Sequence, residues 1–268
     1  MTKGFITVAT GDEHYYKLAD NLVKSYRLFN NNLPFAIITE KENKYISSFD
    51  EVYITGDATH SYLDKFLLNQ YMPYDLMIFI EADMLVYGEI TDLFEIFEEA
   101  DDFSCIGDTW PCDNKTNGWF ITAKLPEHIK NEISYTVGLH GGILFMRKTQ
   151  VVHDVFCTAI DIVNNYEQFS AAFTGSGFRS VPDEPVIALS MALNFCHSTR
   201  PEVPFLSYYP NDRKGFRYNI YNGVCKNKKN KDDDRRLLHW GTSYTYTPRY
   251  EIEEYLMESK NGGGYIIS

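Results

Sequence analysis

Hydrophobic and polar positions follow two alternating patterns along the first hundred residues. Short apolar runs typical of buried strands fall at residues 5–10, 34–39, 51–54, 76–80 and 103–107. Segments with apolar side chains at helical spacing lie between them, at residues 15–29, 61–71 and 91–100. Strands that alternate with helices predict an α/β fold, with a mostly parallel central sheet flanked by helices.

The second half of the chain is less regular. Residues 141–146 predict a strand, and helical spacing indicates helices at 151–166, 183–194 and 249–259. The polar stretch 108–131 is predicted to be a loop, and the charge run 226–236 to be exposed or mobile. We expect a single domain over residues 1–249, followed by a C-terminal helix and a flexible tail over residues 250–268.

Two carboxylates follow the central apolar run, Leu-Met-Ile-Phe-Ile at residues 76–80. Glu81, Ala82 and Asp83 come next, and the apolar residues then resume. Alternate residues of an extended chain point to the same side, so Glu81 and Asp83 should converge at the end of the strand. A divalent cation is the usual reason to bring two anions together. The sequence therefore predicts a metal site here; the alternative is two surface acids that cap a following helix.

His239 is a candidate third metal ligand from a distant part of the chain. It lies between Leu238 and Trp240, so it is either a core histidine with a satisfied ring or a ligand. Two carboxylates and one imidazole suit Mn²⁺ or Mg²⁺ and leave open positions for phosphate oxygens and water.

Three other groups are candidates for binding or catalysis. Asp183 and Glu184 open a predicted helix, where they either complement the helix dipole or orient a reacting hydroxyl. Lys65 lies inside an apolar segment and is placed to reach a phosphate. The sequence His140-Gly141-Gly142 precedes a strand, and its paired glycines indicate either a close backbone approach to a ligand or a turn.

Charge and cysteine content restrict the partners and the location. The formal net charge of −12 argues against a broad nucleic-acid surface, because phosphate neutralisation supplies most of that affinity. No stretch is long and apolar enough to span a membrane. The five cysteines have no CxxC spacing, and the chain starts without a signal peptide. These features predict a cytoplasmic protein, with peripheral membrane association left open.

Taken in order, these motifs resemble the glycogenin-like (family-eight type) glycosyltransferases of the GT-A fold. The resemblance covers most of the chain and is closest around the acidic pair, where the family has an Asp-x-Asp motif followed by Asp-Leu-Phe. The matching segments are Thr7–Asp12 with Tyr15-Tyr16, Leu63–Phe66, Ile80–Val86 with Ile90–Phe94, His140–Leu144, Pro182–Pro185 and Leu238–Gly241.

The resemblance implies transfer of a sugar from a nucleotide-sugar, most simply a UDP-sugar, to an acceptor hydroxyl with retention. It implies that Glu81, Asp83 and His239 hold Mn²⁺ or Mg²⁺. It places the donor near Thr10, Asp12, Tyr15 or Tyr16, Lys65, Glu81, Ala82, His140, Gly141 and Gly142. Asp183 and Glu184 would face the acceptor, which is a glycan, a lipid-linked group or a protein.

Aromatic residues in the polar stretch, Trp110, Trp119 and Phe120, would either stack on sugar rings or form a hydrophobic plug.

The chain departs from the family pattern at three places. Glu81 replaces the first aspartate, His140 replaces an asparagine, and the Lys-Pro-Trp after the histidine is absent, with Arg249 the nearest substitute near the diphosphate. These departures leave open a non-catalytic nucleotide-sugar or glycan-binding protein on the same scaffold. An inverting mechanism, with Asp183 or Glu184 as base, also stays open. A pyrophosphorylase is disfavoured, because the first turn is acidic and lacks a basic, glycine-rich phosphate loop.

Overall fold

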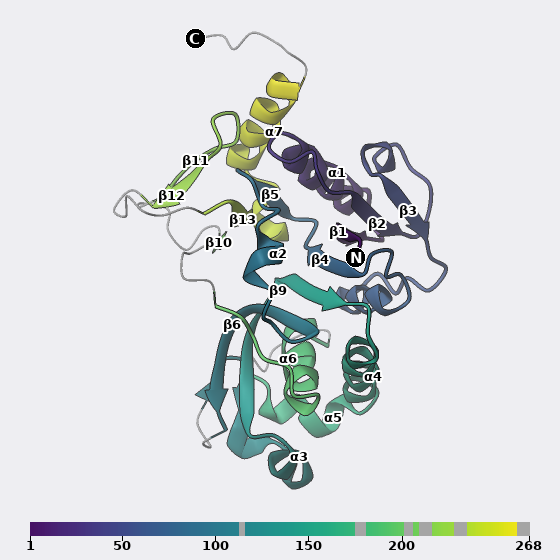
Figure 1. The fold of residues 1–268 in the computed structure, drawn as a ribbon, viewed down its shortest axis with the longest axis vertical. Helices are drawn as coiled ribbons and strands as arrows, with labels where there is room; N and C mark the ends of the chain where they lie inside the picture. The colour runs from purple at the N-terminus through teal and green to yellow at the C-terminus, as the bar shows by residue number, and fades with distance from the viewer. Residues whose placement is uncertain (113–115, 175–180, 201–205, 209–215, 228–234, 262–268) are drawn as a thin grey trace.

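The central sheet has six strands in the order β3-β2-β1-β4-β9-β6 (Figure 1). The structure is a computed structural model that describes the chain except for residues 113–115, 175–180, 201–205, 209–215, 228–234 and 262–268. The strands are β1 Lys3–Ala9, β2 Phe35–Thr39, β3 Glu51–Ile54, β4 Leu76–Ile80, β6 Phe103–Pro111 and β9 Tyr135–Arg147. Strands β1 to β4 pair in parallel, and within this sheet only β9 runs against the others. The predicted α/β fold with a mostly parallel sheet is confirmed.

Helices cover both faces of this sheet. Successive side chains of a strand point to opposite faces, so each face presents apolar side chains to its own layer of helices. Phe5 points into one hydrophobic core, which includes the buried side of α1 (Glu13–Arg27). Its neighbour Ile6 points into the other core, which includes α4 (Gln150–Asn164) and α6 (Asp183–Leu193). Apolar burial on both faces explains why the central strands read as continuous apolar runs.

A small second sheet brings the two halves of the chain together. Strand β5 (Met84–Val86) follows the acidic turn and pairs antiparallel with β13 (Leu237–His239), which in turn pairs with β10 (Leu206–Tyr208). His239 lies opposite Met84 in this register. This pairing carries a C-terminal histidine to the end of β4.

The C-terminal helix α7 (Pro248–Asn261) packs against α1 through a hydrogen bond of 3.2 Å between Asn21 Nδ2 and the Tyr250 hydroxyl. The remaining elements are short. They are η1 Ile46–Ser48, η2 Tyr62–Asn69, α2 Leu93–Ile96, β7 Thr116–Asn117, β8 Phe120–Ile121, η3 Thr122–Lys124, α3 Glu127–Glu132, α5 Tyr166–Phe169, η4 Ser170–Ala172, β11 Phe216–Asn219, β12 Val224–Asn227 and η5 Thr242–Tyr244.

The prediction of a loop over residues 108–131 was wrong in part. Strand β6 continues to Pro111 beside an extended β9, past a bulge between Cys105 and Gly107, and α3 ends the same stretch. Most of the charge run, residues 228–234, and the predicted flexible tail, residues 262–268, lie outside the described residues. The end of the run is held in place, because Arg236 pairs with Asp92 at 2.8 Å.

Among the described helices, none has both the length and the apolar character needed to cross a membrane.

Candidate active site

The turn between β4 and β5 presents Glu81 and Asp83 at the carboxyl end of β4. Backbone bonds on both sides fix it: the Glu81 amide donates to Gly142 O of β9 (3.0 Å), and the Trp240 amide donates to Asp83 O (3.1 Å). The apolar residues on either side of the turn are buried. Burying an unpaired charge is costly, so the two acids lie in the turn between the buried strands.

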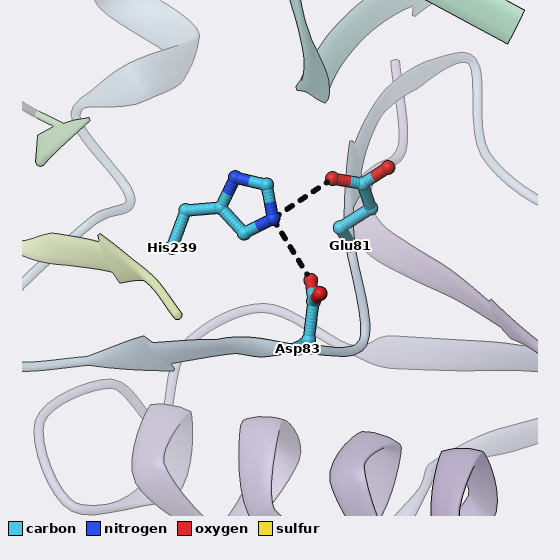
Figure 2. A group of neighbouring side chains, drawn as sticks. All are labelled: Glu81, Asp83 and His239. Atoms are coloured by element: carbon cyan, nitrogen blue, oxygen red, sulfur yellow. Dashed lines mark ion pairs between the residues drawn. The ribbon is translucent and has the colours of Figure 1, made fainter. Parts of the chain in front are cut away.

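His239 completes a three-residue group with these acids (Figure 2). Its Nε2 lies 3.1 Å from Asp83 Oδ1 and 3.5 Å from Glu81 Oε2. One ligand atom from each residue lies within 4.8 Å of the others. Asp83 Oδ1 is buried, and among the described residues His239 Nε2 is the donor that lies close to it. A buried acceptor of this kind fits a cation, and the oxygen and nitrogen donors suit Mn²⁺ or Mg²⁺.

The protonation of His239 reflects its acidic surroundings. Burial lowers the pKa of His239, but the hydrogen bond and charge of Asp83, with the charge of Glu81, outweigh burial and raise it to about 9. The imidazolium therefore balances the two acids at neutral pH, and a metal ion on Nε2 would replace its proton.

Lys65, from η2, forms a second cationic centre next to Glu81. Its ammonium group is buried and donates to Glu81 Oε1 at 2.8 Å and to Gly141 O at 2.9 Å, and it pairs with Asp183. Burial lowers the pKa of Lys65, but the charges of Asp183 and Glu81 raise it above its ordinary value. Lys65 is thus charged, and these contacts engage all three of its N–H donors.

Gly141 and Gly142 lie within β9, so the alternative of a turn at this position was wrong. The Gly141 amide donates to Glu184 Oε1 at 2.8 Å, and an added Cβ at Gly141 would lie 2.7 Å from Glu184 Cγ. An added Cβ at Gly142 would lie 2.1 Å from Met84 Cε and 2.9 Å from Glu81 Oε2. Both glycines therefore allow site side chains to pack directly on the backbone.

Burial favours the neutral forms of both Glu184 and His140. Burial is the main cause that raises the pKa of Glu184 to about 7, and the charge of Asp183 adds to it. Burial also lowers the pKa of His140 well below its ordinary value. The His140 ring lies behind His239, with its Nε2 3.3 Å from His239 Nδ1, and its Nδ1 accepts the Gly142 amide at 2.9 Å.

These residues surround a cavity of about 800 Å³ at the carboxyl edge of the sheet. Most of the predicted site residues line it: Thr10, Asp12, Tyr15, Lys65, Glu81, Ala82, Asp83, Asp183, Glu184 and His239. The others stand outside its lining: Tyr16, His140, Gly141, Gly142 and Arg249.

Two of the residues outside the lining have other contacts. Tyr16 is buried and donates to Glu40 at 2.6 Å, whereas its neighbour Tyr15 faces the cavity. The Arg249 guanidinium lies 4.7 Å from the centre of the Tyr218 ring. Of the two tyrosines and two basic residues proposed for the donor, the structure brings Tyr15 and Lys65 to the cavity.

Sequence reasoning did not assign several residues that line the cavity. Asp64 accepts from Thr10 Oγ1 at 2.5 Å and from the amides of Thr59 and His60, which ties the turn after β1 to η2. His60 has a left-handed backbone, with φ of 58°, a conformation that is uncommon without glycine. The stretch Thr-His-Ser-Tyr-Leu-Asp carries a helix-capping signal at Ser61, but nothing in it indicates the left-handed turn.

No protein-family profile matches this sequence, and no curated protein matches it. Among solved structures, the chain is similar to the galactosyltransferase LgtC in complex with donor and acceptor sugar analogs. The TM-score is 0.55, with 12% identity, over 98% of this chain and 97% of LgtC. It is also similar to the glycosyltransferase GlyE of Streptococcus pneumoniae TIGR4, with a TM-score of 0.50 and 16% identity over 75% of this chain.

The fold is the GT-A fold. The chain spans about half the length of GlyE, since the match covers 46% of that protein. At these identities the likeness establishes the fold alone.

Proposed function

We propose that this chain is a metal-dependent glycosyltransferase of the glycogenin-like type. It transfers a sugar from a nucleotide-sugar, most simply a UDP-sugar, to an acceptor hydroxyl with retention at the anomeric carbon. The observation that carries the proposal is the convergence of Glu81, Asp83 and His239 at one edge of the cavity on this fold. That edge, outside the carboxyl ends of the strands, is where ligands bind in open α/β sheets.

Asp83 and His239 would hold Mn²⁺ or Mg²⁺, with Glu81 contributing directly or through water. When bound, the ion offsets the negative charge that develops on the leaving diphosphate. Lys65 acts as a positioning residue, because its donors hold Glu81 and Asp183 in place. The turn with Thr10 and Asp12, together with Tyr15 at the start of α1, offers hydroxyl, carboxylate and aromatic groups to the nucleotide.

Asp183 and Glu184 have different roles in this proposal. Asp183 is held by its ion pair with Lys65, where it can orient the acceptor hydroxyl or stabilise positive charge on the sugar ring. Glu184, with a pKa of about 7, is suited to exchange a proton near neutral pH. The acceptor is a glycan, a lipid-linked group or a protein. The cytoplasmic location stays a prediction.

Product analysis tests the proposal. UDP-glucose and UDP-galactose are incubated with the protein and a panel of acceptors, with Mn²⁺ or with EDTA, and products are followed by proton NMR. We expect turnover that requires the metal and an α-linked product from the α-linked donor. A β-linked product would contradict retention. Binding of UDP-sugars without turnover of any acceptor would favour the non-catalytic binding protein.

A further inference from the structure

The cavity crosses the carboxyl edge of the sheet in a fixed order. The segment Thr10–Tyr15, which runs into the start of α1, follows β1, and the acids follow β4, the next strand in the sheet. Strand β9 lies on the other side of β4 and supplies Gly141, which contacts Lys65 and Glu184. A nucleotide-sugar with its base at the β1 end and its diphosphate at the β4 turn would place its sugar near β9. The acceptor must therefore enter at the β9 side.

Trp119 lies at this β9 side and lines the cavity with Asp183 and Glu184. Its indole N–H donates to Leu139 O of β9 at 3.0 Å, and its backbone carbonyl accepts from the Thr174 amide at 2.8 Å. The ring also packs against the hydrophobic core below it. Since the polar edge of the indole is already bonded, Trp119 offers the cavity apolar ring surface in a fixed orientation.

We propose that Trp119 is the platform of the acceptor subsite and that the acceptor is a glycoside whose pyranose ring stacks on the indole. This inference rests on the proposed function. A pyranose has an apolar C–H face and a rim of hydroxyls, and the cavity wall matches both. Trp119 provides the aromatic surface, while the carboxylates of Asp183 and Glu184 accept hydrogen bonds from hydroxyls.

A second tryptophan nearby serves as a matched control. Trp110 is close to Trp119 in the sequence and lies at the same end of β9, where an added Cβ at Gly138 would lie 2.1 Å from its ring. Trp110 is outside the lining of the cavity. A general effect of removing an indole from this region would therefore appear in both Trp110→Leu and Trp119→Leu, whereas a stacking role belongs to Trp119 alone.

Saturation-transfer NMR tests the platform without requiring turnover. The protein is loaded with UDP and Mg²⁺, and the probes are methyl glucosides, methyl galactosides, lactose and maltose. Calorimetry of UDP binding is run on the same samples. For Trp119→Leu, we expect glycoside affinity to fall about tenfold, the scale of one lost stacking contact, with UDP affinity unchanged. Trp119→Phe, which keeps a ring but loses the N–H, should retain most of the affinity, and Trp110→Leu should match the native protein.

The outcomes separate the two proposals. If UDP binds but no probe glycoside does, or if Trp110→Leu loses as much glycoside affinity as Trp119→Leu, the acceptor platform is wrong and the donor site stands. Equal glycoside affinity in Trp119→Leu and the native protein overturns the platform as well. If UDP does not bind the native protein, the proposed function fails, and the platform fails with it.

Discussion

The cavity has two acidic corners that meet at Glu81 but are balanced differently. In the metal corner, the imidazole of His239 lies against both acids, Glu81 also accepts from Lys65 through Oε1, and Asp83 Oδ1 is buried with that imidazole as its nearby donor among the described residues. In the lysine corner, Asp183 pairs with Lys65, and Glu184 receives the Gly141 amide.

This difference shows that acidic content does not by itself make a metal site. A fixed ammonium already occupies the lysine corner, so a divalent cation has no position there. In the metal corner, the positive charge against Asp83 is the proton of His239, which a metal ion can replace. The comparison predicts that removing Lys65 damages folding, whereas removing Asp83 damages donor binding.

The largest effect is expected for Lys65→Met. The substitution leaves Asp183 and Glu81 without their buried cation, and breaking a buried pair in this way typically costs about 3–5 kcal/mol. Urea unfolding at pH 7.5 should show a loss of that size. The matched control is Lys17→Met, which breaks the partly exposed pair with Glu254 and should cost less than about 1 kcal/mol. Equal losses in both variants would contradict the comparison.

The next effect is a pH dependence that comes from the lysine corner. Burial raises the pKa of Glu184 from 4.5 to about 7, so the folded state holds its proton more tightly than the unfolded state does. Stability should therefore fall as the pH rises from about 4.5 to about 7, by at most about 3 kcal/mol from this group.

Unfolding free energies of native protein and Glu184→Gln, measured from pH 4.5 to 8, check this sign. The variant should lose the Glu184 contribution and have a flatter profile. Glu253, on the buried side of α7, has a pKa raised mainly by burial to about 7, so Glu253→Gln should remove a second contribution of the same sign. A native profile that rises over this range and does not change in Glu184→Gln would contradict the assignment.

Smaller effects are expected from the two glycines that touch the two corners. Gly141→Ala crowds Glu184 in the lysine corner, and Gly142→Ala crowds Met84 and Glu81 in the metal corner. Each should cost about 1–3 kcal/mol in thermal unfolding experiments. Gly56→Ala is the control, because nothing lies within 4 Å of its added Cβ. If Gly56→Ala is as costly as the others, crowding is not the cause.

Local sequence patterns predicted the acid turn, because the apolar run before Glu81 and its resumption after Asp83 mark a buried strand that ends in charge. His239 was also predicted as a third ligand beside these acids, but the strand pairing that brings it to them was not. It depends on the β5–β13 pairing, and a pairing across some 150 residues leaves no local pattern. Lys65 in an apolar segment signalled a buried partner, but Asp183 became that partner only through the packing of η2 beside α6.

Other features could not be predicted because they depend on register. Adjacent helical residues point about 100° apart, so only one of Tyr15 and Tyr16 can face the cavity, and the orientation of α1 selects Tyr15. The stretch 108–131 was predicted to be a loop because it is polar. In the structure β6 and β9 extend into it past a bulge, and pairing between these strands, rather than local propensity, holds the chain extended.

Calorimetry of UDP binding, with and without Mn²⁺, for the native protein and Asp83→Ala tests the central claim most directly. The exposed Asp108→Ala, outside the cavity, is the control. The predicted result is Mn²⁺-dependent binding by the native protein and by Asp108→Ala, and at least about a hundredfold weaker binding by Asp83→Ala, as expected for loss of several kcal/mol. Equal UDP affinity in Asp83→Ala, or binding that ignores the metal, would contradict the account.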